Sequence, residues 1–426
     1  MSGRDPGGSK WSERAERRLR SWSPLKKVLA LALLAVIVYG GFIAMDGLVL
    51  RPVMNENFGP TPDLSIYQSR AGLLLNGGMI YRDMYVESPP LINYLLIPPQ
   101  LMGGEWWAYE AYFSFFSFLT ALSLYLALRH WNDYYAFIAS VLFLLCPFMV
   151  EDATLGIQDE PIVGFFFIVP VLLFVQGWKK ASALGVAVGF WTKFLSIILY
   201  PVMLLQLRTR GERLRSIGTA LLTSLAIVFP FLLVCPIEFL LFPSYYLLGR
   251  ADGGAGMSAV GLLTKGGIVL PGEAGAVITV VALLVAYLYV WRKGLDVWRG
   301  CLLATVVFLS IYPMIRLGYF LIPFAFFVVW AAEDKWITVR IFLMYIPLLF
   351  AQGLEKGITP DMTFSWSWIA ALALLLIGLA IMLDTTRVVL KKKCFLDQPK
   401  GKAGPILGRI EVPTSAPKVS SSQEVS

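Results

Sequence analysis

The chain has 426 residues, of which 57% are hydrophobic and 15% are charged, and apolar runs long enough to cross a membrane recur along its whole length. This composition excludes a soluble globular protein and predicts an all-α, polytopic membrane protein. The formal net charge of +8 does not indicate a nucleic-acid-binding protein, because the basic residues collect beside the apolar runs on one side of the membrane, as the positive-inside rule requires.

Three regions follow one another along the chain. Residues 1–27 form a basic cytoplasmic arm that we expect to lie on anionic lipid. Residues 28–390 form the transmembrane domain. Residues 391–426 are rich in Lys, Pro and Ser, and we expect a disordered cytoplasmic tail there.

The transmembrane domain contains about 12 predicted crossings, within a range of about 11 to 13. They lie at about 28–45, 106–128, 134–150, 161–177, 181–191, 194–207, 216–235, 276–291, 300–315, 318–332, 337–352 and 366–386. The predicted external loops cover about 46–105, 151–160, 236–275 and 353–365.

Two of these runs, 181–191 and 194–207, are each too short to span about 30 Å of hydrocarbon. Basic residues before the first run and after the second both indicate the cytoplasm, so we predict a broken hairpin with Lys193 at its tip. The cytoplasmic segments then hold 28 Lys and Arg residues and the external segments hold 7. This bias predicts that both termini are cytoplasmic.

The first external loop has its own helical signals. Thr61, Pro62 and Asp63 form a helix start, and apolar residues follow at helical spacing until Asn76-Gly77-Gly78. We expect an amphipathic helix that lies on the membrane surface. The apolar piece from Leu91 to Leu101 is too short to span and should dip into the interface.

Few residues are available for thiol, histidine or nucleotide chemistry. Three of the four cysteines lie in apolar runs, and the single histidine, His130, lies in a predicted cytoplasmic turn. There is no Walker loop, HExxH or GxSxG motif. Carboxylates remain as the candidate catalytic groups.

Two strings in the first loop carry a family resemblance. The pattern D-L-S-I-Y-x-x-x-A-x-x-L-L-x-G-G-x-x-Y-R-D and the later E-S-P-P-L-I-N-Y resemble the first external loop of C-type membrane glycosyltransferases, the fold shared by protein O-mannosyltransferases and the aminoarabinose transferases of lipid A. ATLGIQDEPIVGFFF resembles the start of the family's fourth helix, and TKFLSIILYP and RLGYFLIP are weaker matches. The resemblance covers roughly residues 60–325. It implies a polyprenyl-phosphate (dolichyl-phosphate-type) sugar donor.

The resemblance also implies a role for Asp63. In the family an aspartate early in the first loop acts as general base on the acceptor, and Asp63 occupies that place. Such a base suits an inverting transfer, because the acceptor must lose a proton while the lipid phosphate leaves without gaining one. The alternative is a helix-start carboxylate stabilised by the helix dipole.

Four further carboxylates are candidates to hold a divalent metal ion against the donor phosphate. Glu87 matches an acidic residue that lies near a bound metal in some relatives, and Asp159, Glu160 and, more weakly, Asp152 are the supporting candidates. The alternatives are a turn carboxylate for Glu87 and helix capping for Asp159 and Glu160. The chain has no external histidine, in contrast to relatives that offer one to the metal, so metal dependence stays open.

A phosphate leaving group also favours nearby cations. Lys193, Arg250 and Arg316 lie in external segments, and Tyr319 shares the RLGYFLIP motif with Arg316. Each cation has the alternative role of an interface anchor. The glycine-rich segment 250–268 is expected to be a mobile cover that orders on substrate binding.

The sequence therefore predicts a multi-pass enzyme of the cell membrane that transfers a hexose or pentose on the extracytoplasmic face. Its acceptor is a glycan, a lipid or a protein of the cell envelope. A polytopic transporter or lipid flippase is the alternative, although no repeat between the two halves supports it. A noncatalytic membrane subunit with the same fold is the third hypothesis.

Overall fold

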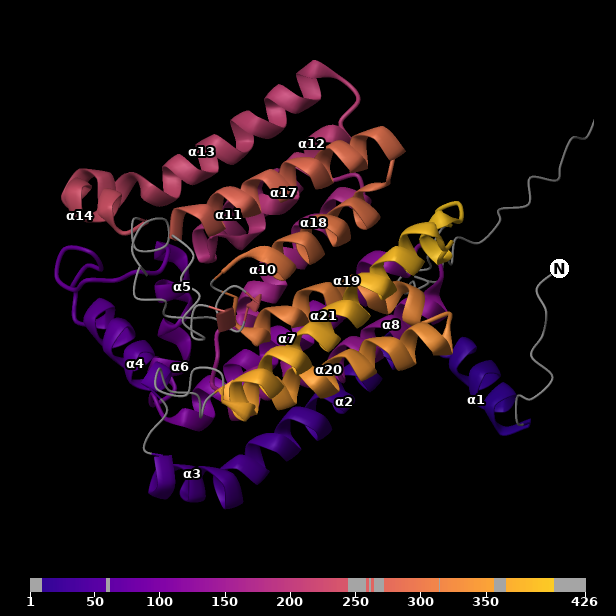
Figure 1. Cartoon of the computed structure of the whole chain (residues 1–426), viewed down its shortest axis with the longest axis horizontal. Coiled ribbons are helices and arrows are strands. Elements are labelled where there is room, and N and C mark those ends of the chain that lie inside the picture. Colours follow the sequence, from indigo (N-terminus) through magenta and orange to yellow (C-terminus); the bar gives the residue numbers. More distant parts are fainter. Residues whose placement is uncertain are drawn as a thin grey trace, which may run out of the picture.

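The computed structural model describes residues 10–58, 62–243, 258–259, 262–263, 272–313, 315–355 and 365–401. Within these ranges the chain is helical and contains no β-strand beyond one isolated bridge between Ile80 and Met84. Figure 1 shows the long helices running side by side as one bundle. The predicted all-α class is confirmed.

Helices cover nearly every predicted crossing. In the first half they are α2 (Pro24–Met45), α7 (Trp106–Leu128), α8 (Asp133–Leu144), α9 (Pro147–Val150), α10 (Glu160–Val175), α11 (Lys179–Thr192), η3 (Phe194–Leu199) and α12 (Tyr200–Leu205). In the second half they are α13 (Arg210–Val234), α14 (Pro236–Leu241), α17 (Gly272–Lys293), α18 (Val297–Ile311), η4 (Leu317–Phe320), α19 (Leu321–Ala331), α20 (Lys335–Glu355) and α21 (Trp366–Lys391).

Six of the described helices are long and apolar enough to cross a membrane, and a seventh span results if the bent pair Asp133–Leu144 and Pro147–Leu155 counts as one. The other predicted crossings fall on shorter helices, such as α10, α18 and α19. Crossings of full length therefore account for about half of the predicted count. The total of about 12 crossings stays a prediction.

The predicted broken hairpin at 181–207 has the expected form. α11 ends at Thr192, Lys193 adopts an extended backbone, and η3 packs back along α11. Met203 of α12 reaches Ser182 of α11, with its Sδ atom 3.5 Å from the Ser182 hydroxyl. The two arms approach closely at Gly189, where a Cβ atom would lie 2.5 Å from the Ser196 hydroxyl oxygen. Glycine at this position therefore lets the arms meet.

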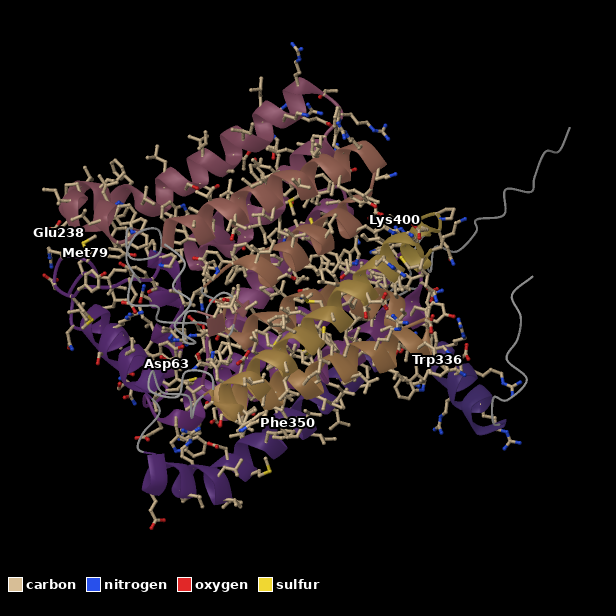
Figure 2. The ribbon with its side chains drawn as sticks, viewed as in Figure 1. Asp63, Met79, Glu238, Trp336, Phe350 and Lys400 are labelled. Atoms are coloured by element: carbon tan, nitrogen blue, oxygen red, sulfur yellow. The ribbon has the colours of Figure 1, made fainter. Side chains whose placement is uncertain are left out.

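The charged residues gather at the two ends of the bundle. Ion pairs between segments join residues that the positive-inside rule places on the same side. At the predicted cytoplasmic end these pairs are Lys27–Asp133, Lys179–Glu212, Arg299–Asp397, Arg340–Asp384 and Lys392–Asp334. Figure 2 shows Asp63, Met79 and Glu238 at one end and Lys400 and Trp336 at the other. Which end faces the cytoplasm stays a prediction.

The first loop folds into short helices that cover one end of the bundle (Figure 1). α4 (Pro62–Leu75) begins at the predicted proline, and Gly77 after it has a positive φ of 77°. The predicted short apolar piece forms α5 (Pro90–Leu95) and α6 (Ile97–Leu101). The expected helix start is confirmed, and the position of these helices at the membrane surface stays a prediction.

The beginning of the C-terminal tail corrects one expectation. We expected disorder from Lys391 onward, but α21 extends to that residue and residues 392–401 fold back over the predicted cytoplasmic end. Phe395 is fully buried, Arg299 makes two hydrogen bonds of 2.8 and 2.9 Å to the Asp397 carboxylate, and the Gly401 N–H donates to the carbonyl of His130. The apolar pair Phe395-Leu396 anchors a segment whose composition is otherwise polar. The remaining tail, 402–426, lies outside the described residues, as does most of the predicted cover, 250–268.

A cysteine in place of Ser65 provides the test of sidedness. Ser65 is exposed on α4, and the four native cysteines are all buried, so background labelling should be low. We expect Ser65→Cys to react with a membrane-impermeant maleimide added to intact cells. The control, Arg387→Cys, lies at the other end, where 77% of the Arg387 side chain is exposed, and should react only after lysis. The reverse pattern would invert the predicted topology.

Candidate functional site

Three residues from distant segments meet at the end of the bundle that carries the first loop. The Gln158 amide N–H donates to Oδ2 of Asp63 at 2.6 Å. Arg316 Nη1 donates to the same Asp63 oxygen at 3.2 Å and to the Gln158 side-chain oxygen at 2.9 Å. Asp63, Gln158 and Arg316 therefore form a closed triangle in which each side chain contacts the other two.

A second charged group is centred on Lys193 at the hairpin tip. Its Nζ lies 2.9 Å from Asp159 Oδ1 and 3.2 Å from Glu160 Oε1, and 4.9 Å from the centre of the Tyr319 ring. Asp159 and Glu160 sit at the start of α10, and Tyr319 lies in η4. The hairpin tip is thereby held against two other segments.

The two groups belong to one site. Burial alone would lower the pKa of Arg316, but the carboxylates of Glu160 and Asp63 raise it above its usual value. One carboxylate from each group therefore raises the pKa of Arg316. Burial is also the main reason that the pKa of the Tyr67 hydroxyl is raised well above its usual range, and the charges of Asp159, Glu160 and Asp63 add to it. Tyr67, on α4, packs its ring against Tyr109 and Phe113.

Lys193 stays charged in this setting. Burial alone would lower the pKa of its ammonium, and the neighbouring Asp159 and Glu160 carboxylates raise it well above the usual value. Only 24% of the Lys193 side chain is exposed, compared with 55% for Arg316. The site therefore holds one fixed, sheltered cation and one that reaches toward solvent.

The backbone between α9 and α10 places Gln158. A turn of π-helix, η2 (Glu151–Leu155), is followed by Ile157 with a φ of +48°, and the Gln158 N–H donates to the Asp152 carbonyl at 2.9 Å. Such strained positions cluster at functional sites. The widened turn directs the Gln158 side chain toward α4.

Asp152 supports the segment that carries Arg316. A Cβ atom on Gly318 would lie 2.5 Å from Oδ2 of the buried Asp152 carboxylate, so the backbone of η4 sits directly on this side chain. Glycine is needed for this close approach. Asp152 therefore lies beside the site but contacts neither Asp63 nor Lys193 in the described interactions.

The structure places two other predicted or neighbouring carboxylates elsewhere in the first loop. Glu87 is paired with Arg70 at 2.9 Å, and Arg70 Nη1 also donates a hydrogen bond of 3.0 Å to the Ser88 hydroxyl. Glu87 therefore fixes α4 to the Pro-Pro segment. Asp83 is bound by Arg82, and this hydrogen bond, with that from the Met79 N–H, lowers the pKa of Asp83 to about 2. Arg250 lies outside the described residues.

Gln158 is the residue that sequence reasoning missed. It directly precedes the predicted Asp159 in the string GIQDEP. An uncharged amide does not by itself indicate a catalytic or binding residue in a sequence. Its orientation follows from its contacts, because its amide nitrogen donates to Asp63 and to the Gly156 carbonyl while its oxygen accepts from Arg316. A flipped amide would place donor against donor.

The described residues do not fit a metal site. No three carboxylate, histidine or cysteine side chains among them gather closely enough to hold a metal ion, and Asp159 and Glu160 already have an ammonium partner. Metal dependence, which the sequence left open, is tested by chelation.

Treatment with EDTA tests whether the reaction depends on a metal ion. Because Lys193 and Arg316 place two cations in the described site, we expect turnover to stay within about twofold after EDTA, as in a transfer where these cations take the place of a metal ion. The measurement is the rate of sugar transfer in EDTA and after return of Mg²⁺ or Mn²⁺. A loss of more than tenfold that either ion restores would show that a metal completes the site.

Comparison with known proteins gives a match at the level of fold. The structure is similar to the crystal structure of ArnT from Cupriavidus metallidurans bound to undecaprenyl phosphate, with a TM-score of 0.52 and 16% sequence identity, over 87% of this chain and 73% of that chain. No family model matches the sequence. No curated protein matches it either. The two proteins therefore share a fold, and the bound undecaprenyl phosphate is a feature of ArnT.

Proposed function

We propose that the protein is an inverting glycosyltransferase that moves a hexose or pentose from a polyprenyl phosphate to an acceptor on the extracytoplasmic face of the membrane. The observation that carries the proposal is the triangle of Asp63, Gln158 and Arg316 beside the half-buried Lys193. It combines the Asp63 carboxylate with two cations, of which Lys193 is paired with Asp159 and Glu160. It lies at the end of a bundle whose fold resembles that of a polyprenyl-phosphate-binding protein.

Each part of this arrangement suits one need of the reaction. Asp63 accepts the proton of the acceptor hydroxyl as the new glycosidic bond forms. The bond between the anomeric carbon and the phosphate oxygen breaks, and the polyprenyl phosphate leaves with the electron pair. Lys193 and Arg316 then stabilise the charge that develops on the phosphate.

The ion pairs also predict an order of binding. Both cations are held by carboxylates in the described structure, Lys193 by Asp159 and Glu160 and Arg316 by Asp63. A phosphate group that binds Arg316 replaces Asp63 as its partner, which frees the Asp63 carboxylate to accept a proton. The donor therefore binds first, and the base becomes available only when a sugar is ready for transfer.

Product analysis tests the proposal. Purified protein is supplied with radiolabelled polyprenyl-phosphate hexoses and pentoses, and the release of free polyprenyl phosphate is measured with cell-envelope extract as the acceptor source. In parallel, the envelope glycans and glycolipids of a strain that lacks the protein are weighed by mass spectrometry. We expect one donor to be consumed and one sugar to be missing from the envelope.

Movement of intact polyprenyl-phosphate sugar across a reconstituted bilayer, without release of polyprenyl phosphate, would contradict the proposal and favour a flippase. An unchanged envelope together with no consumption of any donor would favour a noncatalytic subunit.

A further inference from the structure

A strongly basic surface surrounds the start of α13, at the end of the bundle opposite the candidate site. Six cations and one carboxylate, here called the basic patch, form it: Lys179, Lys180, Arg208, Arg210, Arg213, Arg215 and Glu212. Among the described ion pairs only Lys179–Glu212, at 2.8 Å, lies within the patch. The other five cations have no carboxylate partner among the described residues, so the patch carries a large positive charge.

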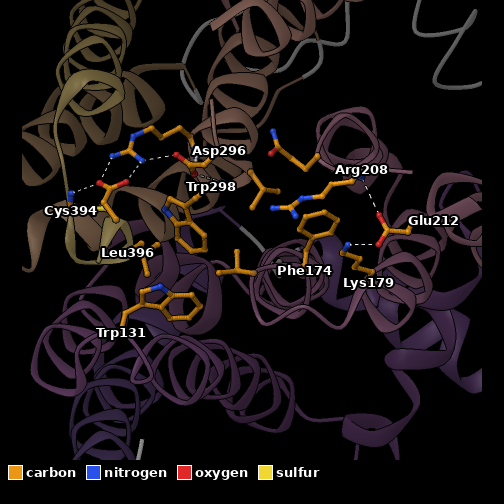
Figure 3. A pocket seen from close by; sticks show the side chains of 14 residues that line it. Trp131, Phe174, Lys179, Arg208, Glu212, Asp296, Trp298, Cys394 and Leu396 are labelled. Carbon is orange, nitrogen blue, oxygen red and sulfur yellow. Dashed lines mark hydrogen bonds and ion pairs between the residues drawn. The ribbon is translucent and has the colours of Figure 1, made fainter. Parts of the chain in front are cut away.

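Two cavities of about 540 and 460 Å³ open at this patch, and Lys179 and Glu212 line both. The larger cavity, shown in Figure 3, also contains Arg299, which is held by Asp296 and Asp397. Most of its charges are thus already paired within the protein. It offers little attraction to an anion beyond the Arg208 side chain.

The smaller cavity is different, because two of its cations lack a carboxylate partner in the described ranges. Lys180 and Arg215 line it, together with Trp178. The Trp178 side chain is 65% exposed, and tryptophan at a helix end is typical of the level of the lipid headgroups. The smaller cavity therefore combines positive charge with a side chain suited to the membrane interface.

An uncovered apolar face runs directly away from this cavity. Only 11% of the most apolar stretch of α13 is buried. Its exposed side chains recur at helical spacing along one face: Leu214, Leu221, Leu222, Leu225 and Phe229. The face begins within the basic patch and continues toward the other end of the helix, which is the layout of a charged headgroup followed by hydrocarbon chains.

We propose that the smaller cavity binds the headgroup of an anionic diacyl phospholipid, with its phosphate between Lys180 and Arg215 and its acyl chains along the exposed face of α13. Clusters of Lys and Arg beside membrane helices attract anionic headgroups. The continuous apolar face favours a lipid over a free phosphate, because a free phosphate has no hydrocarbon chain to contact this face. This site is separate from the donor site, which lies at the other end of the bundle.

Native mass spectrometry of the full-length protein tests the site. The protein is titrated in detergent with dioleoylphosphatidylglycerol and with dioleoylphosphatidylcholine. We expect preferential binding of phosphatidylglycerol, and the double variant Lys180→Gln/Arg215→Gln should weaken it about 30-fold, from the usual contribution of two cations near an anionic surface. The matched control is Arg292→Gln/Lys293→Gln, which removes two exposed cations at the C-terminal end of α17 and should leave the affinity within about twofold.

Three results would overturn the proposal. One is equal phosphatidylglycerol affinity in the patch variant and the control variant, with both proteins folded by their thermal unfolding temperature. Another is equal binding of the two lipids. A third is displacement of the bound lipid by millimolar inorganic phosphate, which would identify a site for a small free anion. If the double variant does not fold, Lys180→Gln alone is used, because Lys180 is exposed.

Discussion

Replacing Asp63 by asparagine should lower turnover by about 10²–10⁴, the usual contribution of a general base. The amide keeps the size of the side chain and an oxygen that accepts hydrogen bonds from Gln158 and Arg316, but it cannot take the proton of the acceptor. We therefore expect normal expression and donor binding with a large loss of kcat. The measurement is the rate of sugar transfer at saturating donor, together with donor affinity.

Asp83→Asn is the matched control for this variant. Asp83 is another first-loop aspartate paired with an arginine, and 33% of its side chain is exposed, compared with 24% for Asp63. We expect its turnover to stay within a few-fold of the wild type. If Asp63→Asn also stays within a few-fold, Asp63 is only a helix-start carboxylate. The base must then be sought among the carboxylates that the structure places in or beside the site, which are Asp152, Asp159 and Glu160.

Replacing Arg316 by glutamine should produce the second-largest loss, about 10²–10³ in kcat/KM, which is the usual effect of removing one donor that stabilises developing charge. Part of the loss should appear as a raised KM for the donor, because Arg316 is proposed to bind the phosphate before reaction. Arg316→Lys keeps the charge but loses the second donor of the guanidinium, so it should restore activity only partly. The split between kcat and KM is measured at fixed acceptor.

Arg82→Gln controls for the loss of an arginine at this end of the bundle. The Arg82 side chain is 48% exposed and binds one aspartate, much as Arg316 does at 55% exposure. We expect normal kinetics from Arg82→Gln. Equal kinetic effects of the two substitutions would show that Arg316 acts through general surface charge and does not contact the donor phosphate.

Hydropathy predicted the helices well because each transmembrane helix is specified by its own residues. The start of α4 at Pro62 and the break at Lys193 are also local, since a proline, a glycine run or a short apolar run signals each of them. The gathering of charges at the two ends follows from the alternation of crossings. These features needed no knowledge of which helices are neighbours.

The partners within the site could not be predicted in the same way. Asp63 and Arg316 are 253 residues apart in sequence, and Asp63 and Gln158 are 95 apart, so their contacts depend on how whole helices pack. The predicted grouping of Glu87 with Asp159 also depended on packing, and the structure gives Glu87 a partner in Arg70. A neutral amide such as Gln158 has no signal of its own, because its importance comes from the two charges it touches.

The segment 392–401 can fold onto the bundle only late in synthesis, because its partners lie much earlier in the chain. Its partners Arg299, on α18, and Asp334, between α19 and α20, precede it by 58 to 98 residues, so the ribosome synthesises them before it reaches Phe395. Until then, Arg299 lacks the Asp397 carboxylate, and the apolar surface that Phe395 later covers is exposed. Among the described residues Arg299 then keeps only Asp296 as its carboxylate partner, and a buried cation with fewer partners is less stable, so we expect a chain that ends before this segment to be more sensitive to proteases. The segment thus stabilises this end of the bundle only after residues 392–401 have been synthesised.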